Sequence, residues 1–321
     1  MGKSPGDEIL AKAEKKATSS PGWFGSSSQK WEEAGDLFAQ AANSYKVEGR
    51  WSDSGAAFER EAACRNKAGE SNDEINAWHN AAKSYKKSNP EVPPGTLFSS
   101  PPHSFTEETD DLDALMGHLT YFQAAVTALH QCIKLLVKSG NFRQAADREK
   151  EIAGIYAQDG LDIAKARDSF VQAGDWYKQE DANATANQCY QQAAELSADL
   201  QDFKRSMELY QTVADWSLTS ALTKYSVKEY WLRACMCSMA MGDLVLCQRL
   251  LETFSTKDVT FPSTREAKFA HELMDACEQG DVERYTAAVY QYDQVTKLDN
   301  WKTAILLKIK KALEEDEGGL T

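Results

Sequence analysis

The sequence predicts an all-α fold, an α-solenoid of stacked helical hairpins followed by a C-terminal helical bundle. A short block, AANSYK at 41–46, returns as AAKSYK at 81–86, a shift of 40 residues, and again as AGDWYK at 173–178. Segments of roughly 15–18 residues have helical periodicity and end at short polar or glycine-containing turns. Strand signals are missing along the whole sequence. A period of about 40 residues that is built from two helices is typical of tetratricopeptide-like repeats.

The composition indicates a folded, acidic, cytoplasmic protein. The chain has 321 residues, a formal net charge of −13 and 42% hydrophobic residues. The acidic balance argues against nucleic-acid binding, because phosphate contacts need basic surface. No apolar run approaches the ~20 residues of a membrane span, and residues 1–16 lack the apolar core of a secretory signal. Seven cysteines without framework spacing suit a reducing compartment, so we expect buried free thiols.

Residues 1–30 are predicted to form an N-terminal helix and an aromatic loop. Trp23 and Phe24 stand in the stretch SSPGWFGSSSQKW, where glycine, serine and proline leave little structure to bury them. One interpretation is that the two rings fold back onto a neighbouring helix. The other is that they are displayed for contact with a membrane or a partner. The residues by themselves leave both interpretations open.

The next region, 31–219, is predicted to be the helical-repeat solenoid. Small Ala and Gly residues on one face of each helix let neighbouring helices approach closely, while Tyr, Phe and Trp fill the spaces between them. The segment 92–123 departs from this pattern, because proline, serine and acidic residues interrupt the third hairpin.

Two interpretations of 92–123 stay open. The first is a disordered surface insertion. The second is a retained intron. Val92 to Gln123 is 32 residues, or 96 nucleotides at three per residue. Every Val codon begins with GT and one Gln codon ends in AG, the two ends that an intron needs. Removing the segment joins KKSNPE to AAVTALHQCIKLL and restores one continuous hairpin. Sequencing of the mature transcript decides between the two.

Beyond about residue 220 the repeat weakens. Residues 231–251 are apolar almost all round, as expected of a buried helical hairpin rather than of a solenoid face. Three further helical segments follow this hairpin. We therefore predict a C-terminal helical bundle over 220–313 that caps the solenoid, and an acidic tail, EEDEGGLT, over 314–321.

The sequence has no recognisable catalytic constellation. None of the five histidines is spaced with Cys or Glu as metal ligands are. Cys235 and Cys237 diverge by about 200° on a helix, which favours core thiols over a metal site. There is no phosphate-binding glycine loop and no nucleophile elbow. We therefore expect a binding scaffold without enzymatic activity, metal or cofactor.

Several segments resemble one known family in the right order and over nearly the whole chain. They are GWFGSSSQKWEEAGDLFAQAANSYKVEGRW, LTKYSVKEYWLRA, FPSTREAKF, YDQVTKLDNWKTAILLKIKK and the acidic end of the chain. The family is that of the soluble N-ethylmaleimide-sensitive-factor attachment proteins (SNAPs), alpha type. The resemblance implies a cytosolic adaptor whose copies wrap a four-helix SNARE bundle and recruit the hexameric ATPase that unwinds it after membrane fusion. The alternative is a general tetratricopeptide-like scaffold for another trafficking or chaperone complex.

The resemblance also implies roles for individual residues. It gives Trp23 and Phe24 a membrane contact, which favours the displayed interpretation of the loop. It places SNARE binding on basic side chains of the solenoid: Lys46, Arg50, Lys86, Lys87, Arg148, Lys178 and Arg205. It places ATPase binding on acidic residues and the penultimate leucine: Asp275, Glu278 and Leu320.

The chain departs from the family pattern at several of its cations. Asn141 stands where relatives have Arg, and Asp147 and Gln188 stand where relatives have Lys. Gln192 lies one turn beyond Gln188. These losses weaken the expected electrostatic attraction to an acidic bundle, although each exposed ion pair is worth only ~0–1 kcal/mol.

Overall fold

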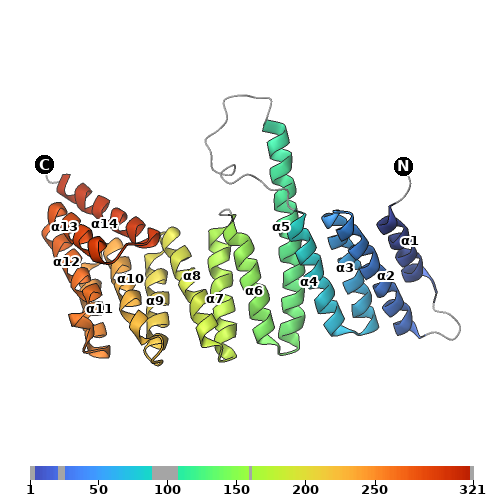
Figure 1. Cartoon of the computed structure of the whole chain (residues 1–321), viewed down its shortest axis with the longest axis horizontal. Helices are drawn as coiled ribbons and strands as arrows, with labels where there is room; N and C mark the ends of the chain where they lie inside the picture. The colour runs from blue at the N-terminus through green and yellow to red at the C-terminus, as the bar shows by residue number, and fades with distance from the viewer. Residues whose placement is uncertain (1–3, 21–25, 89–107, 159–160, 319–321) are drawn as a thin grey trace. The chain divides into compact units, whose positions relative to one another are not determined.

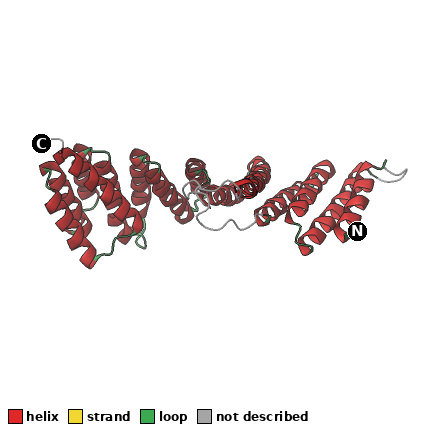
Figure 2. Cartoon of the chain, turned by 90° about the horizontal axis from the view of Figure 1, so that it is seen from above, coloured by secondary structure: helices red, strands yellow, loops and turns green. Residues whose placement is uncertain are grey.

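The computed structural model describes residues 4–20, 26–88, 108–158 and 161–318, and within them every regular element is helical (Figure 1, Figure 2). The all-α prediction is therefore confirmed. The chain divides into two compact units, Met1–Leu161 and Asp162–Thr321. Among the helices of the described ranges, none has the length and apolar character that crossing a bilayer requires.

The first unit is a row of helices, each packed against the next one in the sequence (Figure 1). Local sequence fixes the helix ends. Ser4 and Asp7 form a capping box at the first helix, and Gly69 ends the third in the left-handed conformation with φ 85°. The helices are α1 (Pro5–Thr18), α2 (Ser27–Val47), α3 (Trp51–Ala68), α4 (Ser71–Lys87), α5 (Glu108–Lys138) and α6 (Phe142–Ala157).

The second unit begins as a similar row and becomes a bundle. Consecutive packing continues from α7 to α10, and α10 then contacts α11, α12 and α14 as well as α9. The elements are α7 (Ile163–Gln179), α8 (Asn183–Asp199), α9 (Phe203–Ser217), η2 (Lys224–Ser226), α10 (Val227–Ala240), α11 (Leu244–Lys257), η3 (Phe261–Ser263), α12 (Arg265–Gln279), α13 (Val282–Val295) and α14 (Asn300–Gly318).

A glycine beneath a tyrosine ring recurs in three helix pairs. A Cβ atom added to Gly55 on α3 would lie 2.5 Å from Cε1 of Tyr85 on α4. Gly174 on α7 stands in the same relation to Tyr190 on α8, at 2.6 Å. The third pair is Gly6 with Tyr45, where the ring of α2 covers α1. Because real Cβ contacts are never this short, only glycine allows these helices to approach so closely.

Each of these rings also has a polar partner on the helix that it covers. Tyr45 donates a hydrogen bond of 2.9 Å from its hydroxyl to Oδ1 of Asp7, the residue after Gly6. Tyr190 donates one of 2.7 Å to Oδ1 of Asp175, the residue after Gly174. The ring and its hydroxyl therefore fix both the spacing and the register of the two helices.

The segment 92–123 is not an uninterrupted disordered insertion. Residues 108–123 form the first half of α5, and the ring of Phe122 is only 2% exposed. The apolar residues Leu112, Leu115, Leu119 and Phe122 have helical spacing, and that pattern continues into the rest of α5. Residues 92–107 lie outside the described residues, and the intron hypothesis stays a prediction.

We expect Gly55→Ala to lower the free energy of unfolding by about 1–2 kcal/mol, because the buried ring of Tyr85 cannot move away from the new methyl group. Gly154→Ala is the matched control, since Gly154 is inside α6 and a Cβ there meets nothing within 4 Å. It should raise stability by about 0.5–1 kcal/mol through helix propensity. Urea unfolding followed by circular dichroism measures both, and equal effects of the two variants would contradict the close-contact explanation.

Candidate binding surfaces

A basic pocket of about 340 Å³ opens on the surface of the first unit. It forms where the last turns of α2 and α4 meet the start of α3 and the middle of α6. Lys46 and Lys86 occupy the same position in the repeated block, so the 40-residue period brings both to the same end of their helices. The lining residues are Lys46, Trp51, Lys83, Ser84, Lys86, Lys87 and Glu151.

Aromatic rings hold two of these ammonium groups in place. Nζ of Lys46 lies 4.2 Å from the ring centroid of Phe58, and Nζ of Lys87 lies 4.8 Å from that of Trp51. Burial lowers the pKa of Lys46, and the nearby charges of Lys83 and Lys87 lower it further. In the part of the chain that the structure describes, none of these three lysines forms an ion pair with a carboxylate. The pocket therefore has positive charge that the chain itself does not neutralise.

The wall of the pocket contains one carboxylate, and cations surround it. Nζ of Lys86 lies 3.1 Å from Oε1 of Glu151, and Nη1 of Arg148 lies 3.2 Å from Oε2. Nε2 of His79 is 3.4 Å from the same Oε2 and also contacts Arg148. Burial by itself would raise the pKa of Glu151, but the hydrogen bond to His79 and the charge of Lys86 outweigh it and hold the pKa at about 2. Lys86 and Arg148 are therefore already paired.

Arg50, another expected SNARE-binding residue, is bonded within the first unit. Its guanidinium lies 3.0 Å from Oδ1 of Asp7 and 2.6 Å from Oδ2 of Asp53, and it donates a hydrogen bond of 3.1 Å to Oγ of Ser4. It also stacks on the ring of Tyr45, 4.4 Å from its centroid. These contacts connect α1 to the turn between α2 and α3.

The remaining two expected cations lie in the second unit. Lys178 is exposed in the last turn of α7. Arg205 is in the first turn of α9, with Nη1 3.5 Å from Oε2 of Glu208, and lines a polar pocket of about 230 Å³. Gln188 and Gln192 are exposed on α8, where added lysines would reach solvent.

Sequence reasoning missed an exposed apolar surface on two adjacent connections of the second unit. Leu222 and Tyr225, between α9 and α10, are 93% and 83% exposed, and Val259, between α11 and η3, is 86% exposed. Nζ of Lys224 lies 4.0 Å from Oδ2 of Asp258, which places the two connections together. The available signal was the same as at Trp23, an apolar residue inside a polar turn.

The acidic candidates lie near the C-terminal end. Asp275 and Glu278 are on α12, where Asp275 is 3.3 Å from Nη2 of Arg284 and Glu278 is exposed. Glu314 and Glu315 are exposed near the end of α14. Trp23, Phe24 and Leu320 lie outside the described residues.

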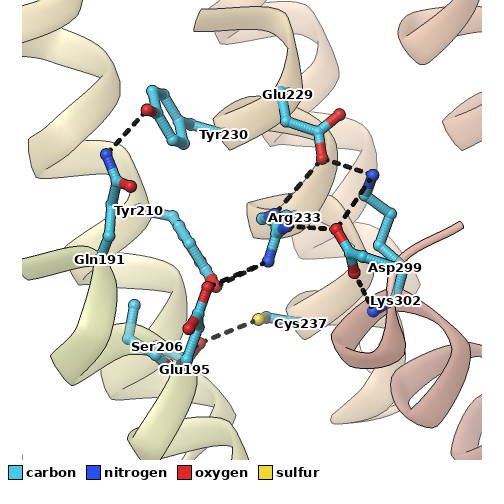
Figure 3. A network of polar contacts seen from close by, with 11 residues as sticks. Gln191, Glu195, Ser206, Tyr210, Glu229, Tyr230, Arg233, Cys237, Asp299 and Lys302 are labelled. Carbon is cyan, nitrogen blue, oxygen red and sulfur yellow. Dashed lines mark hydrogen bonds and ion pairs between the residues drawn. The ribbon is translucent and has the colours of Figure 1, made fainter. Parts of the chain in front are cut away.

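A charge network around two largely buried cations, Arg233 and Lys302, was also missed from the sequence and fixes the start of α14 (Figure 3). The guanidinium of Arg233 on α10 is 2.6 Å from Oδ2 of Asp299 and 3.4 Å from Oε1 of Glu229, and it donates a hydrogen bond of 3.2 Å to the hydroxyl of Tyr210. Lys302, which is 4% exposed, is 2.6 Å from the same Glu229 oxygen. The network therefore joins α14 to α9 and α10.

Known proteins resemble this chain over both units. A family model described as "Soluble NSF attachment protein, SNAP" matches residues 4–99 and 114–314. Vesicular-fusion protein SEC17 of Coprinopsis cinerea is 51% identical over 316 residues, which cover 98% of this chain and 98% of that protein. The probable vesicular-fusion protein sec17 homolog of Schizosaccharomyces pombe is 34% identical over 317 residues, 98% of each chain. Alpha-soluble NSF attachment protein of Mus musculus is 30% identical over 316 residues, 97% of this chain and 96% of that protein.

We expect Glu151→Gln to lower the free energy of unfolding at neutral pH by about 2–3 kcal/mol, because it removes the charge that Lys86, Arg148 and His79 surround. The pKa of Glu151 is depressed from 4.5 to about 2 in the folded protein. Its contribution is therefore fully present above about pH 4.5 and is lost as the pH falls toward about 2. Urea unfolding at several pH values should show the difference between variant and wild type shrinking across that window.

The control is Glu208→Gln, which removes an exposed carboxylate with one 3.5 Å ion pair. It should change stability by less than about 0.5 kcal/mol at any pH. A difference between Glu151→Gln and wild type that stayed constant down to about pH 2.5 would contradict the depressed pKa.

Proposed function

We propose that this chain, which belongs to the soluble NSF attachment protein (SNAP) family, is a vesicular-fusion adaptor that joins assembled SNARE bundles to the ATPase NSF, the N-ethylmaleimide-sensitive factor. The names of its relatives, vesicular-fusion protein and NSF attachment protein, support an adaptor rather than an enzyme. The observation on this chain that supports the proposal most directly is the basic pocket, whose unneutralised charge calls for an acidic partner.

On the SNARE side, the basic pocket is the proposed main contact. Lys46 and Lys87 have no carboxylate partner in the described residues, so a bundle carboxylate gains attraction there without breaking an internal ion pair. Lys178 adds an exposed charge from the second unit. Arg50 and Arg148 are weaker candidates, because each would first have to release its own aspartate or glutamate.

On the ATPase side, the proposed contacts are acidic. Asp275 and Glu278 on α12 and the exposed Glu314 and Glu315 near the end of α14 would steer the chain to a basic domain. Leu320, close behind them in the sequence, would then supply a small apolar contact. The charge network at Arg233 supports this arrangement, because it holds the start of α14 on α10.

The proposed membrane contact is Trp23 and Phe24, on a cytoplasmic protein that associates with membranes peripherally. Full burial of two such side chains is worth roughly 3–6 kcal/mol at most. That is marginal for one copy, but it multiplies when several copies bind one SNARE bundle.

Disassembly of a fluorescently labelled SNARE complex by the ATPase, with and without this chain, tests the adaptor function. Addition of the chain should be required for disassembly. The variant Lys46→Glu/Lys87→Glu should lower the rate at limiting protein by about tenfold, since reversed charges lose attraction and add repulsion of about 1.4 kcal/mol in total. The loss should be smaller at high salt, where exposed charges are screened.

Lys268→Glu is the control, a charge reversal at one exposed lysine of α12 that makes half the charge change of the double variant. It should leave the rate near that of wild type. The adaptor function would be overturned if neither the wild type nor any variant stimulated disassembly. Equal losses of rate in the control and in the double variant would show that the basic pocket does not take part in disassembly.

We expect Trp23→Ser/Phe24→Ser to reduce disassembly on liposome-anchored SNARE complexes several-fold and to leave disassembly of soluble complexes unchanged, because only the anchored format offers a bilayer to the rings. Circular dichroism should show unchanged helical content. Equal losses in the two formats would mean that the rings pack inside the protein.

A further inference from the structure

The basic pocket has more positive charge than one acidic side chain can neutralise. Lys46, Lys83 and Lys87 converge on it from α2 and α4 within about 340 Å³, without an ion pair to a carboxylate in the described residues. Glu151 in the wall does not offset them, because it is already paired with Lys86 and Arg148. Three ammonium groups therefore share one site without an ion pair, and the charge of Glu61 opposes only that of Lys46.

The site is also built before any ligand arrives. The rings of Phe58 and Trp51 hold Lys46 and Lys87, and both lysines lie in the last turns of helices whose spacing is set by the close glycine–tyrosine contacts. The hydroxyl of Ser84, which also lines the pocket, donates a hydrogen bond of 2.9 Å to the carbonyl of Asn80. Burial and the neighbouring ammonium groups lower the pKa of Lys46. The fold therefore holds these cations close together against their mutual repulsion.

Charge and donor number favour phosphate over carboxylate as the ligand. A carboxylate offers one negative charge and two oxygens, whereas a phosphomonoester offers about 1.5–2 charges and three acceptor oxygens. Three lysine ammonium groups match three phosphate oxygens. A pocket of this volume also has room for a small phosphorylated polyol beside Trp51.

We propose that the basic pocket binds a phosphomonoester anion, with Lys46, Lys83 and Lys87 donating to its oxygens and Trp51 forming one wall. The ligand is a small phosphorylated polyol, either free or as the headgroup of a lipid. Because the same lysines are the proposed SNARE contact, the anion and the SNARE bundle exclude one another. That exclusion rests on the proposed function, whereas binding of the anion does not.

Isothermal titration of the full chain with inositol 1,4,5-trisphosphate tests the proposal. The trisphosphate should bind at one site. Citrate, a carboxylate anion that also has three acidic groups, should bind at least about tenfold more weakly. Lys83→Gln and Lys87→Gln should each weaken binding of the trisphosphate about tenfold, as expected for loss of one charge-assisted hydrogen bond. Lys268→Gln, the matched control on α12, should leave it unchanged. Urea unfolding verifies that each variant is folded.

Equal binding of citrate and the trisphosphate would overturn the proposal, as would unchanged affinity in both pocket variants or an equal loss in Lys268→Gln.

Liposomes with and without phosphatidylinositol 4,5-bisphosphate identify the source of the ligand. Liposome binding that needs both this lipid and the side chains of Lys83 and Lys87 supports the headgroup. Binding of the soluble trisphosphate alone supports a free ligand. A pull-down with a SNARE bundle, run in parallel, separates the two hypotheses. A chain that captures the bundle but not the trisphosphate overturns only the phosphate site, and the reverse result overturns only the SNARE contact.

Discussion

The close contact between a helical glycine and a tyrosine ring is the constraint on which the stacked helices depend. With no Cβ at Gly55 or Gly174, the facing ring lies directly on the helix backbone, and its hydroxyl or edge selects the register. The basic pocket follows from the same contact, because Lys46 and Lys86 come directly after Tyr45 and Tyr85 in the sequence. Once the rings are fixed, the lysine that follows each one has only a small range of positions. The packing of the core therefore places the charges on the surface.

A strongly acidic chain can still present a local positive surface. The formal net charge is −13, yet Lys46, Lys83 and Lys87 share one pocket without an acidic neighbour that pairs with them. Arg50, in contrast, is neutralised by Asp7 and Asp53. Screening at physiological salt acts over about 8 Å, so an approaching partner responds to the nearest charges rather than to the total. The net charge of the chain therefore predicts little about this surface.

Sequence reasoning reached the all-α fold from local periodicity, and it reached Lys46, Lys86 and Lys87 through the resemblance to a known family. Lys46 and Lys86 recur in the same block, and a repeated block returns its side chains to equivalent places. Glu151 could not be predicted, since it is 65 residues from Lys86 and meets it only through the packing of α4, α5 and α6. The network of Arg233 with Asp299 likewise depends on a contact across 66 residues. The helix over 108–123 was missed because the prolines and acidic residues before it outweighed its apolar spacing.

The charge network at Arg233 makes α14 a mechanical element of its unit. The helix has 19 residues, a rod of about 28 Å, and its first turn is fixed to α10 by Lys302 and Asp299. A force applied near Glu314 would be transmitted along the helix to these ion pairs, because no flexible linker lies between them to extend instead. Pulling Lys302, which is 4% exposed, away from Glu229 would leave a buried ammonium group without its partner, so the anchor would resist until α10 itself began to move. Tension at the end of α14 thus becomes tension in the helix stack.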